Sequence, residues 1–208
     1  GLGTRLRPLT DDRPKALVPV NGQPLLGHAL AYLRRQGVRE VVVNIHHFGD
    51  LVLAYLAQHP PEGLVVHVSD ERDQVLETGG GLLKAAPLLR GDAPIVLYNV
   101  DVLTDLSLSA MLAQHVASGA LATLAVRHRE SSRYLLFDAE DRLSGWRHQG
   151  TGEERRVRPA DAYRPLAFSG IHLIDPRLLG RIPQRGVFSI VESYLSLAKQ
   201  TPSYAYPH

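Results

Sequence analysis

The first half of the chain alternates between helical patterns and short apolar runs. Apolar residues from Leu25 to Leu33 recur at helical spacing behind Pro24, and Gly37 follows them, which predicts a helix. Continuous apolar runs predict buried strands at 40–45, 64–69 and 95–99, with further helices at 48–58 and 78–89. This order of strands and helices is typical of an α/β fold with a parallel sheet between helices.

The pattern becomes richer in strands after residue 121. Strands are expected at 121–127, 133–137, 143–146 and 166–174, a polar loop at 150–164, and a helix at 188–198. The pair of segments around Arg133 and Trp146 indicates a hairpin. We therefore expect one domain over residues 1–208, with an α/β half at 1–120 and a β-rich half at 121–208.

Composition narrows the class of protein. The 208 residues are 44% hydrophobic, which is enough to bury the core of one domain. The net charge of +2 gives no reason to expect nucleic acid or a membrane surface as a partner, and no apolar run reaches the ~18 residues of a membrane span. The absence of cysteine excludes disulfides and thiolate metal sites, and no signal peptide is visible, so a cytoplasmic protein is the default expectation.

The N-terminal segment has the composition of a phosphate-binding surface. Gly1 and Gly3 allow a tight turn with exposed N–H groups, and Arg5 offers a planar fork to phosphate oxygens. Lys15 adds a compact charge in a chain that otherwise favours arginine; the other lysines are Lys84 and Lys199. The segment matches neither the P-loop nor the dinucleotide fingerprint. A short glycine and arginine turn could equally be surface structure, but the longer string, G-L-G-T-R-L-R-P-L-T-x₃-P-K-A-L-V-P-V, indicates function.

Two further segments lie where ligands bind in such sheets, at the carboxyl ends of the predicted strands. Residues 70–84 contain E-T-G-G-G, whose glycines would open a helix and let a flat base approach free N–H groups; a flexible turn capped by Thr78 is the alternative. Residues 95–101 form an apolar strand that ends at Asp101; taken alone, an aspartate after a strand is usually a cap or turn residue.

A further group of candidates includes Asn44 and the pair His46 and His47, which lie at the carboxyl end of the strand predicted at 40–45. No further ligand at suitable spacing supports a zinc site, so capping or contact with a ligand is preferred for these residues. The segment F-S-G-I-H from Phe168 to His172 lies in the β-rich half; Ser169 and Gly170 could contact hydroxyl groups, or the glycine could permit a close approach within a buried strand.

Together these motifs resemble sugar-1-phosphate nucleotidyltransferases, the sugar-nucleotide pyrophosphorylases. The resemblance spans nearly the whole chain; within the family, E-T-G-G-G with F-S-G-I is most similar to N-acetylmuramate-1-phosphate uridylyltransferases and small mannose-1-phosphate guanylyltransferase-like enzymes. It implies the Rossmann-like nucleotide-diphospho-sugar transferase fold, with a mostly parallel central sheet flanked by helices. Residues 1–120 would then bind the nucleotide, and residues 121–208 the sugar acceptor.

The resemblance also implies roles for particular residues. Arg5 would hold the β- and γ-phosphates, Lys15 would neutralise the α-phosphate, and Asp101 would bind Mg²⁺, which makes these three the candidate catalytic residues. The nucleotide site would be formed by Gly1, Leu2, Gly3, Thr4, Arg5, Lys15, Glu77, Thr78, Gly79, Gly80 and Gly81. The sugar site would be formed by Asn44, His46, Phe168, Ser169 and Gly170.

The resemblance raises one question about the ends of the chain. The family pattern has an apolar strand before the first glycine and a second metal-binding aspartate near the end of the core, and this sequence contains neither. We therefore expect a chain that is truncated at both ends.

The predicted activity is transfer of a nucleoside monophosphate from an NTP to a sugar 1-phosphate, with release of pyrophosphate. UTP is slightly preferred over GTP or CTP as the donor, and a monomer or homodimer is expected. Two alternatives stay open: a CTP-dependent transferase acting on a non-sugar alcohol phosphate such as phosphocholine, and a non-catalytic protein that binds nucleotide sugars.

Overall fold

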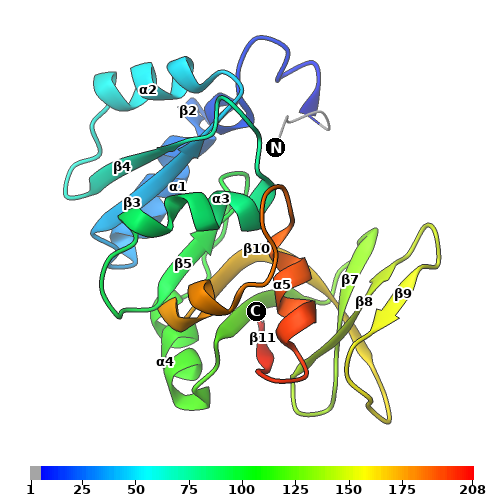
Figure 1. The fold of residues 1–208 in the computed structure, drawn as a ribbon. Coiled ribbons are helices and arrows are strands. Elements are labelled where there is room, and N and C mark those ends of the chain that lie inside the picture. The colour runs from blue at the N-terminus through cyan, green and yellow to red at the C-terminus, as the bar shows by residue number, and fades with distance from the viewer. Residues whose placement is uncertain (1–5) are drawn as a thin grey trace. The chain divides into compact units, whose positions relative to one another are not determined.

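The computed structural model describes residues 6–208, which form two compact units (Figure 1). Within the described residues, unit 1 comprises residues 6–90, 100–105 and 186–188, and unit 2 comprises residues 91–99, 106–185 and 189–208. The chain therefore passes between the units several times, and each unit contains its own sheet and buried core.

Unit 1 is built on a parallel pair of strands, β3 (Glu40–Ile45) and β4 (Val65–Asp70). Its other elements are the short helix η2 (Lys15–Leu17), the hairpin strands β1 (Pro19–Val20) and β2 (Gln23–Pro24), the helices α1 (Leu25–Arg35), α2 (Gly49–Gln58) and α3 (Glu77–Ala85), and the short helix η3 (Ala86–Leu88). Leu26 and Leu30 of α1, Ile45 of β3 and Val52 of α2 form one buried cluster. The apolar faces predicted from the sequence thus hold α1 and α2 against β3.

Unit 2 contains a seven-stranded sheet. Six strands lie in the order β11-β6-β10-β7-β8-β9, and β5 pairs with β10 outside this path. Their bounds are β5 (Ile95–Tyr98), β6 (Ala122–Arg127), β7 (Arg133–Phe137), β8 (Leu143–His148), β9 (Glu154–Arg156), β10 (Arg164–Ile174) and β11 (Ser203–Pro207). The eleven residues of β10 make it the common partner of β5, β6 and β7.

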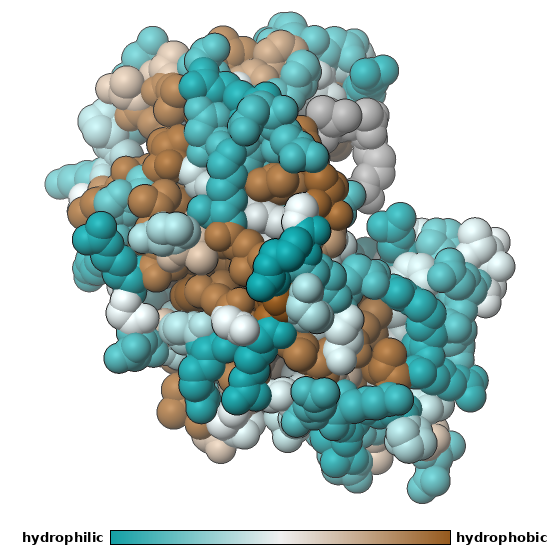
Figure 2. All heavy atoms as spheres, in the orientation of Figure 1, coloured by the Kyte–Doolittle hydropathy of each residue, from teal (hydrophilic) through white to brown (hydrophobic). Residues whose placement is uncertain are grey.

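Helices cover the sheet of unit 2. The helix α4 (Leu108–Ser118) packs on β6 and β10, and α5 (Ile190–Leu197) packs on β8; the short helix η4 (Pro176–Arg181) follows β10. Met111 of α4 and Tyr194 of α5 are almost completely buried, so each helix inserts a large side chain into this core. Figure 2 shows hydrophilic residues over much of the visible surface, with apolar residues gathered between them.

The structure confirms the α/β class, and most predicted elements are present within a few residues of their expected bounds. The parallel pairing of β3 with β4 is also as expected. The seven-stranded sheet differs from the mostly parallel sheet of the prediction, because only β11 and β6 pair in parallel and the other pairs are antiparallel. An apolar run shows that a strand is buried, but it carries no information about the direction of its partner.

Several elements were not anticipated, among them β9, α4 and β11. The predicted polar loop at 150–164 contains β9, which pairs with β8. The helix α4 was not predicted, although Ser107 caps it by accepting a hydrogen bond from the N–H of Ala110. The strand β11 was not predicted either; it gains its partner only because β6 lies beside it. In the described part of the chain, no helix is both long and apolar enough to cross a membrane.

Candidate functional site

Unit 1 contains most of the residues predicted to bind the nucleotide. Gly1, Leu2, Gly3, Thr4 and Arg5 lie outside the described residues, so their predicted roles are not addressed by the structure. Lys15 begins the short helix η2 directly after Pro14, whose extended conformation precedes the helix. This position places the ammonium group of Lys15 at the end of the motif that suggested a phosphate site.

Lys15 forms an ion pair with Asp101, the other candidate catalytic residue described in unit 1. The Nζ atom of Lys15 lies 2.8 Å from Oδ2 of Asp101, and the side chains are 24% and 36% exposed. These two residues are far apart in the sequence and belong to two of the three predicted motifs. The fold therefore brings a compact cation and a carboxylate together where solvent, and hence a ligand, can reach both.

The surroundings of Asp101 fit a metal ion that takes few protein ligands. Among the described residues, no three His, Cys, Asp or Glu side chains gather into a group that could hold a metal by themselves. Mg²⁺ is commonly bound through one or two carboxylates together with water and substrate phosphates. A single accessible carboxylate beside a lysine is compatible with that mode of binding and does not resemble an all-protein metal site.

The predicted base-recognition segment begins α3. Glu77 and Thr78 are exposed at the start of this helix, whereas Gly79, Gly80 and Gly81 are buried. The N–H groups of Gly79 and Gly80 both donate to the carbonyl oxygen of Phe188, at 2.9 and 3.4 Å. The expectation of free N–H groups at these two glycines is therefore not met in the structure; Glu77 and Thr78 are the accessible part of the segment.

The three glycines are required by close packing within unit 1. A Cβ atom at Gly79 would overlap the ring of Phe188, and one at Gly80 would overlap the carbonyl oxygen of Gly186. A Cβ atom at Gly81 would lie 2.6 Å from Oε1 of Glu71, which is well inside van der Waals contact. The packing of the helix start explains E-T-G-G-G independently of any ligand, and nucleotide contact by the segment stays a prediction.

Asn44 belongs to a polar network beside this helix. Its Nδ2 atom donates to Oε1 of Glu71 at 2.6 Å and to the carbonyl oxygen of Gly81 at 3.1 Å. Glu71 is only 3% exposed, and its Oε2 atom accepts a hydrogen bond from the N–H of Leu76 at 3.2 Å. The amide nitrogen of Asn44 thus connects β3 to α3, while its predicted contact with a sugar is not tested.

His46 follows the same strand and is partly buried. Its Nδ1 atom accepts a hydrogen bond from the N–H of His47 at 2.7 Å, and burial lowers the pKa of His46. The ring of His47 contacts that of Phe48, with centroids 4.0 Å apart. A neutral His46 can offer hydrogen bonds to hydroxyl groups, and the preference for ligand contact or a local structural role over zinc stays a prediction.

The predicted sugar-binding residues Phe168, Ser169 and Gly170 lie in unit 2, in β10. Gly170 has a φ of +77°, and the strand register shifts between Phe168 and His172. Gly170 accepts a hydrogen bond from the N–H of Asn99, and a Cβ atom at Gly170 would lie 2.6 Å from the Asn99 side chain. The glycine is therefore needed for a bulge that passes close to Asn99.

Ser169 is engaged within the same unit. Its Oγ atom lies 3.0 Å from Nε2 of His208, whose Nδ1 atom accepts a hydrogen bond from Arg127. The carbonyl oxygen of Phe168 accepts a hydrogen bond from Arg129 at 3.3 Å. The segment is thus held in place by polar contacts, and its contact with a sugar stays a prediction.

Sequence reasoning missed two residues that organise these segments. Glu71 was not singled out, although an acidic residue directly after a predicted strand could have drawn attention to it. The sequence gives no signal that Glu192 of α5 pairs with Arg155, which donates to both of its carboxylate oxygens, at 2.9 and 2.7 Å. This contact lowers the pKa of Glu192.

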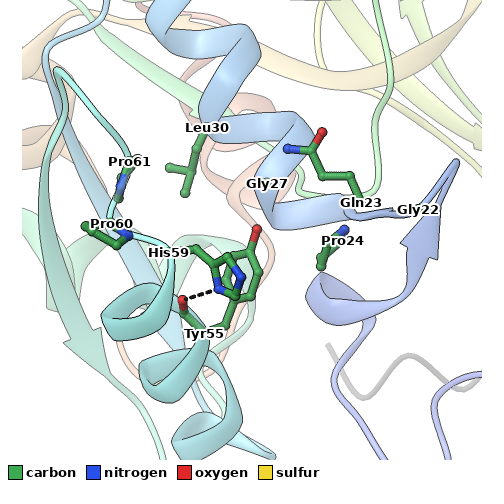
Figure 3. A pocket seen from close by; sticks show the side chains of 9 residues that line it. All are labelled: Gly22, Gln23, Pro24, Gly27, Leu30, Tyr55, His59, Pro60 and Pro61. Atoms are coloured by element: carbon green, nitrogen blue, oxygen red, sulfur yellow. Dashed lines mark hydrogen bonds between the residues drawn. The ribbon is translucent and has the colours of Figure 1, made fainter.

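Unit 1 also contains a small open cavity of about 360 Å³. Figure 3 shows it between the start of α1 and the end of α2, where the ring of Tyr55 stacks on that of His59 at 4.7 Å. The other residues that line it are Gly22, Gln23, Pro24, Gly27, Leu30, Pro60 and Pro61. None of these residues belongs to the predicted nucleotide or sugar site.

The sequence of this chain matches a known protein family. Residues 1–144 match the family model described as nucleotidyl transferase. N-acetylmuramate alpha-1-phosphate uridylyltransferase from Caulobacter vibrioides is 37% identical over 207 residues, covering 95% of this chain and 81% of the relative. A mannose-1-phosphate guanyltransferase from Pichia angusta is 28% identical over 209 residues, covering 99% of this chain and 56% of the relative.

A solved structure shows the same fold. HddC from Yersinia pseudotuberculosis, crystallised with GMP-PN, aligns with a TM-score of 0.80 and 19% identity, covering 100% of this chain and 87% of that chain. The nucleotide-diphospho-sugar transferase fold expected from the motifs is thereby confirmed. At this level of identity the similarity supports the fold and does not transfer a ligand.

Proposed function

The chain belongs to the nucleotidyl transferase family, and on this premise we propose that it transfers a nucleoside monophosphate from an NTP to a sugar 1-phosphate. The observation that carries the proposal is the ion pair between Lys15 and Asp101, because it joins the phosphate motif to the predicted metal-binding carboxylate. An oxygen of the sugar phosphate attacks the α-phosphorus, the bond to the bridging oxygen of the β-phosphate breaks, and pyrophosphate leaves with that electron pair.

The described residues have electrostatic roles in this reaction. Two phosphate groups that both carry negative charge must approach one another, so positioning and cationic screening account for most of the rate enhancement. The Nζ atom of Lys15 would neutralise the α-phosphate, and Arg5, which precedes the described residues, would hold the β- and γ-phosphates. In this arrangement, Lys15 moves from its ion pair with Asp101 to the nucleotide.

Enzymes of this family generally use a divalent metal, and we assign Mg²⁺ to Asp101. When bound, Mg²⁺ supplies positive charge to the phosphate oxygens. Asp101 would hold it through a carboxylate that is 36% exposed and so accessible to a hydrated ion. The ammonium group of Lys15 beside the carboxylate balances its charge before substrate binds.

Base and sugar recognition are assigned to different residues. Glu77 and Thr78 are the exposed residues of the base segment and are the proposed contacts with the base. UTP is the proposed donor because the uridylyltransferase of Caulobacter vibrioides is the more similar of the two named relatives. We propose that Asn44, His46, Phe168, Ser169 and Gly170 contact the sugar, that the enzyme acts in the cytoplasm, and that it is a monomer or homodimer.

The test is pyrophosphate release by the full-length protein on a matrix of four NTPs and several sugar 1-phosphates, with Mg²⁺ present or chelated. The expected result is release that requires both substrates and the metal, fastest with UTP. Phosphocholine and glycerol phosphate form a second arm, and activity only in that arm would replace the sugar acceptor with an alcohol phosphate. Nucleotide binding without any pyrophosphate release would overturn the proposed enzymatic function.

A further inference from the structure

Glu71 is a buried carboxylate held by neutral donors in unit 1. Its side chain is 3% exposed, with Asn44 Nδ2 at 2.6 Å from Oε1 and the N–H of Leu76 at 3.2 Å from Oε2. Burying a charge is unfavourable unless hydrogen bonds compensate it. The hydrogen bonds from Asn44 and Leu76 provide this compensation, so the carboxylate ties these two residues together.

These contacts reach both ends of the predicted base segment. Leu76 immediately precedes Glu77, and Gly81 is the last residue of the segment. Asn44 donates to Glu71 and to the carbonyl oxygen of Gly81 through the same nitrogen, while Oε1 of Glu71 occupies the space beside Gly81 that a Cβ atom would need. Glu71 is thus bonded directly to the residue before the segment and, through Asn44, to its final residue.

The conformation of the segment needs such support. Glu77 has a φ of +58°, a left-handed conformation that is unfavourable for a residue other than glycine. The side chains of Glu77 and Thr78 are exposed at this point. Their direction therefore depends on how firmly the backbone on either side is held.

We propose that Glu71 is a positioning residue that fixes the backbone from Leu76 to Gly81 and thereby sets the affinity for the nucleobase. The inference rests on the proposed function, because it requires this segment to contact the base. It differs from that function in assigning the control of base binding to a residue that does not itself touch the nucleotide. Glu71 should affect ligands that carry a base and leave pyrophosphate, which carries none, unaffected.

Glu71→Gln is the informative substitution. Glutamine has nearly the same shape, but one of its two terminal groups is an NH₂ donor, so either Asn44 or Leu76 then faces a donor in place of an acceptor. Loss of a buried charge-assisted acceptor predicts a rise in the KM for NTP of about 10- to 100-fold. The kcat should change less than about threefold, because Lys15 and Asp101 keep their geometry.

The reverse reaction separates positioning from general damage. With the full-length protein, KM is measured for the NDP-sugar, which carries the base, and for pyrophosphate, which does not. For Glu71→Gln, the KM for the NDP-sugar should rise with that for the NTP, while the KM for pyrophosphate stays within about twofold of the wild-type value. A general loss of structure would impair both substrates, and an equal rise for pyrophosphate would overturn the proposal.

Two more variants complete the test. Asp70→Asn removes a neighbouring carboxylate that pairs with Arg72, outside the network of Glu71, and should leave every KM unchanged. Asn44→Ala breaks the same network from β3 and should also raise the KM for NTP, which provides the answer if Glu71→Gln does not fold. If the wild-type protein releases no pyrophosphate, the proposed function fails; if it is active and both network variants keep the wild-type KM for NTP, this inference fails.

Discussion

Each unit has a hydrogen-bonded polar pair beside a segment predicted to bind a substrate, and the two pairs are chemically different: only Glu71 of the first pair is buried, whereas both members of the second are. In unit 1, Glu71 and Asn44 lie beside the glycines of α3 and form a carboxylate–amide network. In unit 2, Nδ1 of His172 lies 2.6 Å from the hydroxyl of Tyr194, and the His172 ring packs edge-on against Phe168. Burial lowers the pKa of His172 to about 3 and raises that of Tyr194, so this second pair is neutral.

The two units therefore differ in the charge that they carry near these segments. Unit 1 combines buried polar support with exposed charges at Lys15 and Asp101, as expected where charged phosphates and a metal bind. Unit 2 supports the Phe168 segment with a neutral buried pair, which suits a rigid surface for an uncharged part of a substrate. Four experiments test this difference.

The largest expected effect is on catalysis in unit 1. Lys15→Ala removes the charge proposed to act on the α-phosphate and should reduce kcat by about 10²- to 10⁴-fold, the scale expected for one preorganised electrostatic group. Pyrophosphate release under saturating substrates is the measurement. The control is Lys199→Ala, which removes an exposed lysine from the end of unit 2 and should have no effect. A normal rate for Lys15→Ala would remove the proposed distinction between the units.

The second effect concerns the packing of the base segment. Gly79→Ala places a methyl group against the ring of Phe188 and should destabilise the protein by up to about 3 kcal/mol through overpacking. The free energy of unfolding in urea is the measurement. Gly180→Ala serves as the control, because nothing lies within 4 Å of a Cβ atom there. Equal stability of the two variants would mean that the glycines of α3 are not required by packing.

The third effect tests the neutrality of the buried pair in unit 2. Burial lowers the pKa of His172 from 6.5, its ordinary value, to about 3 in the folded protein. Between these two pH values the unfolded chain therefore binds more protons than the folded protein. Stability should therefore be full above pH 6.5 and should fall as the pH falls, by about 2 kcal/mol between pH 7 and pH 5 for this group alone. His172→Gln should flatten this part of the profile in urea unfolding experiments.

His128→Gln is the control for that profile, because His128 lies on the surface of unit 2 and its replacement should leave the slope unchanged. If wild type and His172→Gln lose the same free energy between pH 7 and pH 5, then His172 is not held neutral by burial. The contrast between the polar pairs of the two units would then disappear.

The smallest effect is on a partly exposed ion pair in unit 2. Arg155 donates to both oxygens of Glu192 and lies over the ring of Trp146, 5.0 Å from its centroid. Since both charged side chains are about 40% exposed, Arg155→Ala should lower the unfolding free energy by about 1 kcal/mol or less. Arg90→Ala, at an exposed position, provides the control for thermal unfolding. If Arg155→Ala lowered the unfolding free energy several times more than this, the partly exposed charges of unit 2 would stabilise the protein as strongly as buried groups do.

Much of the local structure was predictable because it depends on short-range patterns. The helical spacing from Leu25 to Leu33 predicted α1, and the apolar run from Glu40 to Ile45 predicted β3. The direction of β5 was not predictable, since its antiparallel partner β10 lies more than sixty residues later in the chain. The strand β11 was missed for a similar reason, because its pairing with β6 depends on residues far away in sequence.

The candidate site shows the same division. Lys15 and Asp101 were identified separately from their motifs, whereas their ion pair appears only in the folded chain. The glycines of α3 were predicted to expose N–H groups, and the structure shows the N–H groups of Gly79 and Gly80 bonded to Phe188. Glu71 was overlooked because its position directly after a predicted strand does not by itself show that the carboxylate is buried.

The sequence alone determined the class of the fold, the resemblance to its family and the types of residue available for phosphate, base and metal. These properties depend on residue chemistry and on spacings within single segments, which a linear chain contains in full. Tertiary structure decided which strands pair, which amide groups are occupied, and that Lys15 meets Asp101 while Glu71 meets Asn44. Those outcomes depend on distances between residues remote in sequence, and such distances are set only when the apolar surfaces of the whole chain are buried together.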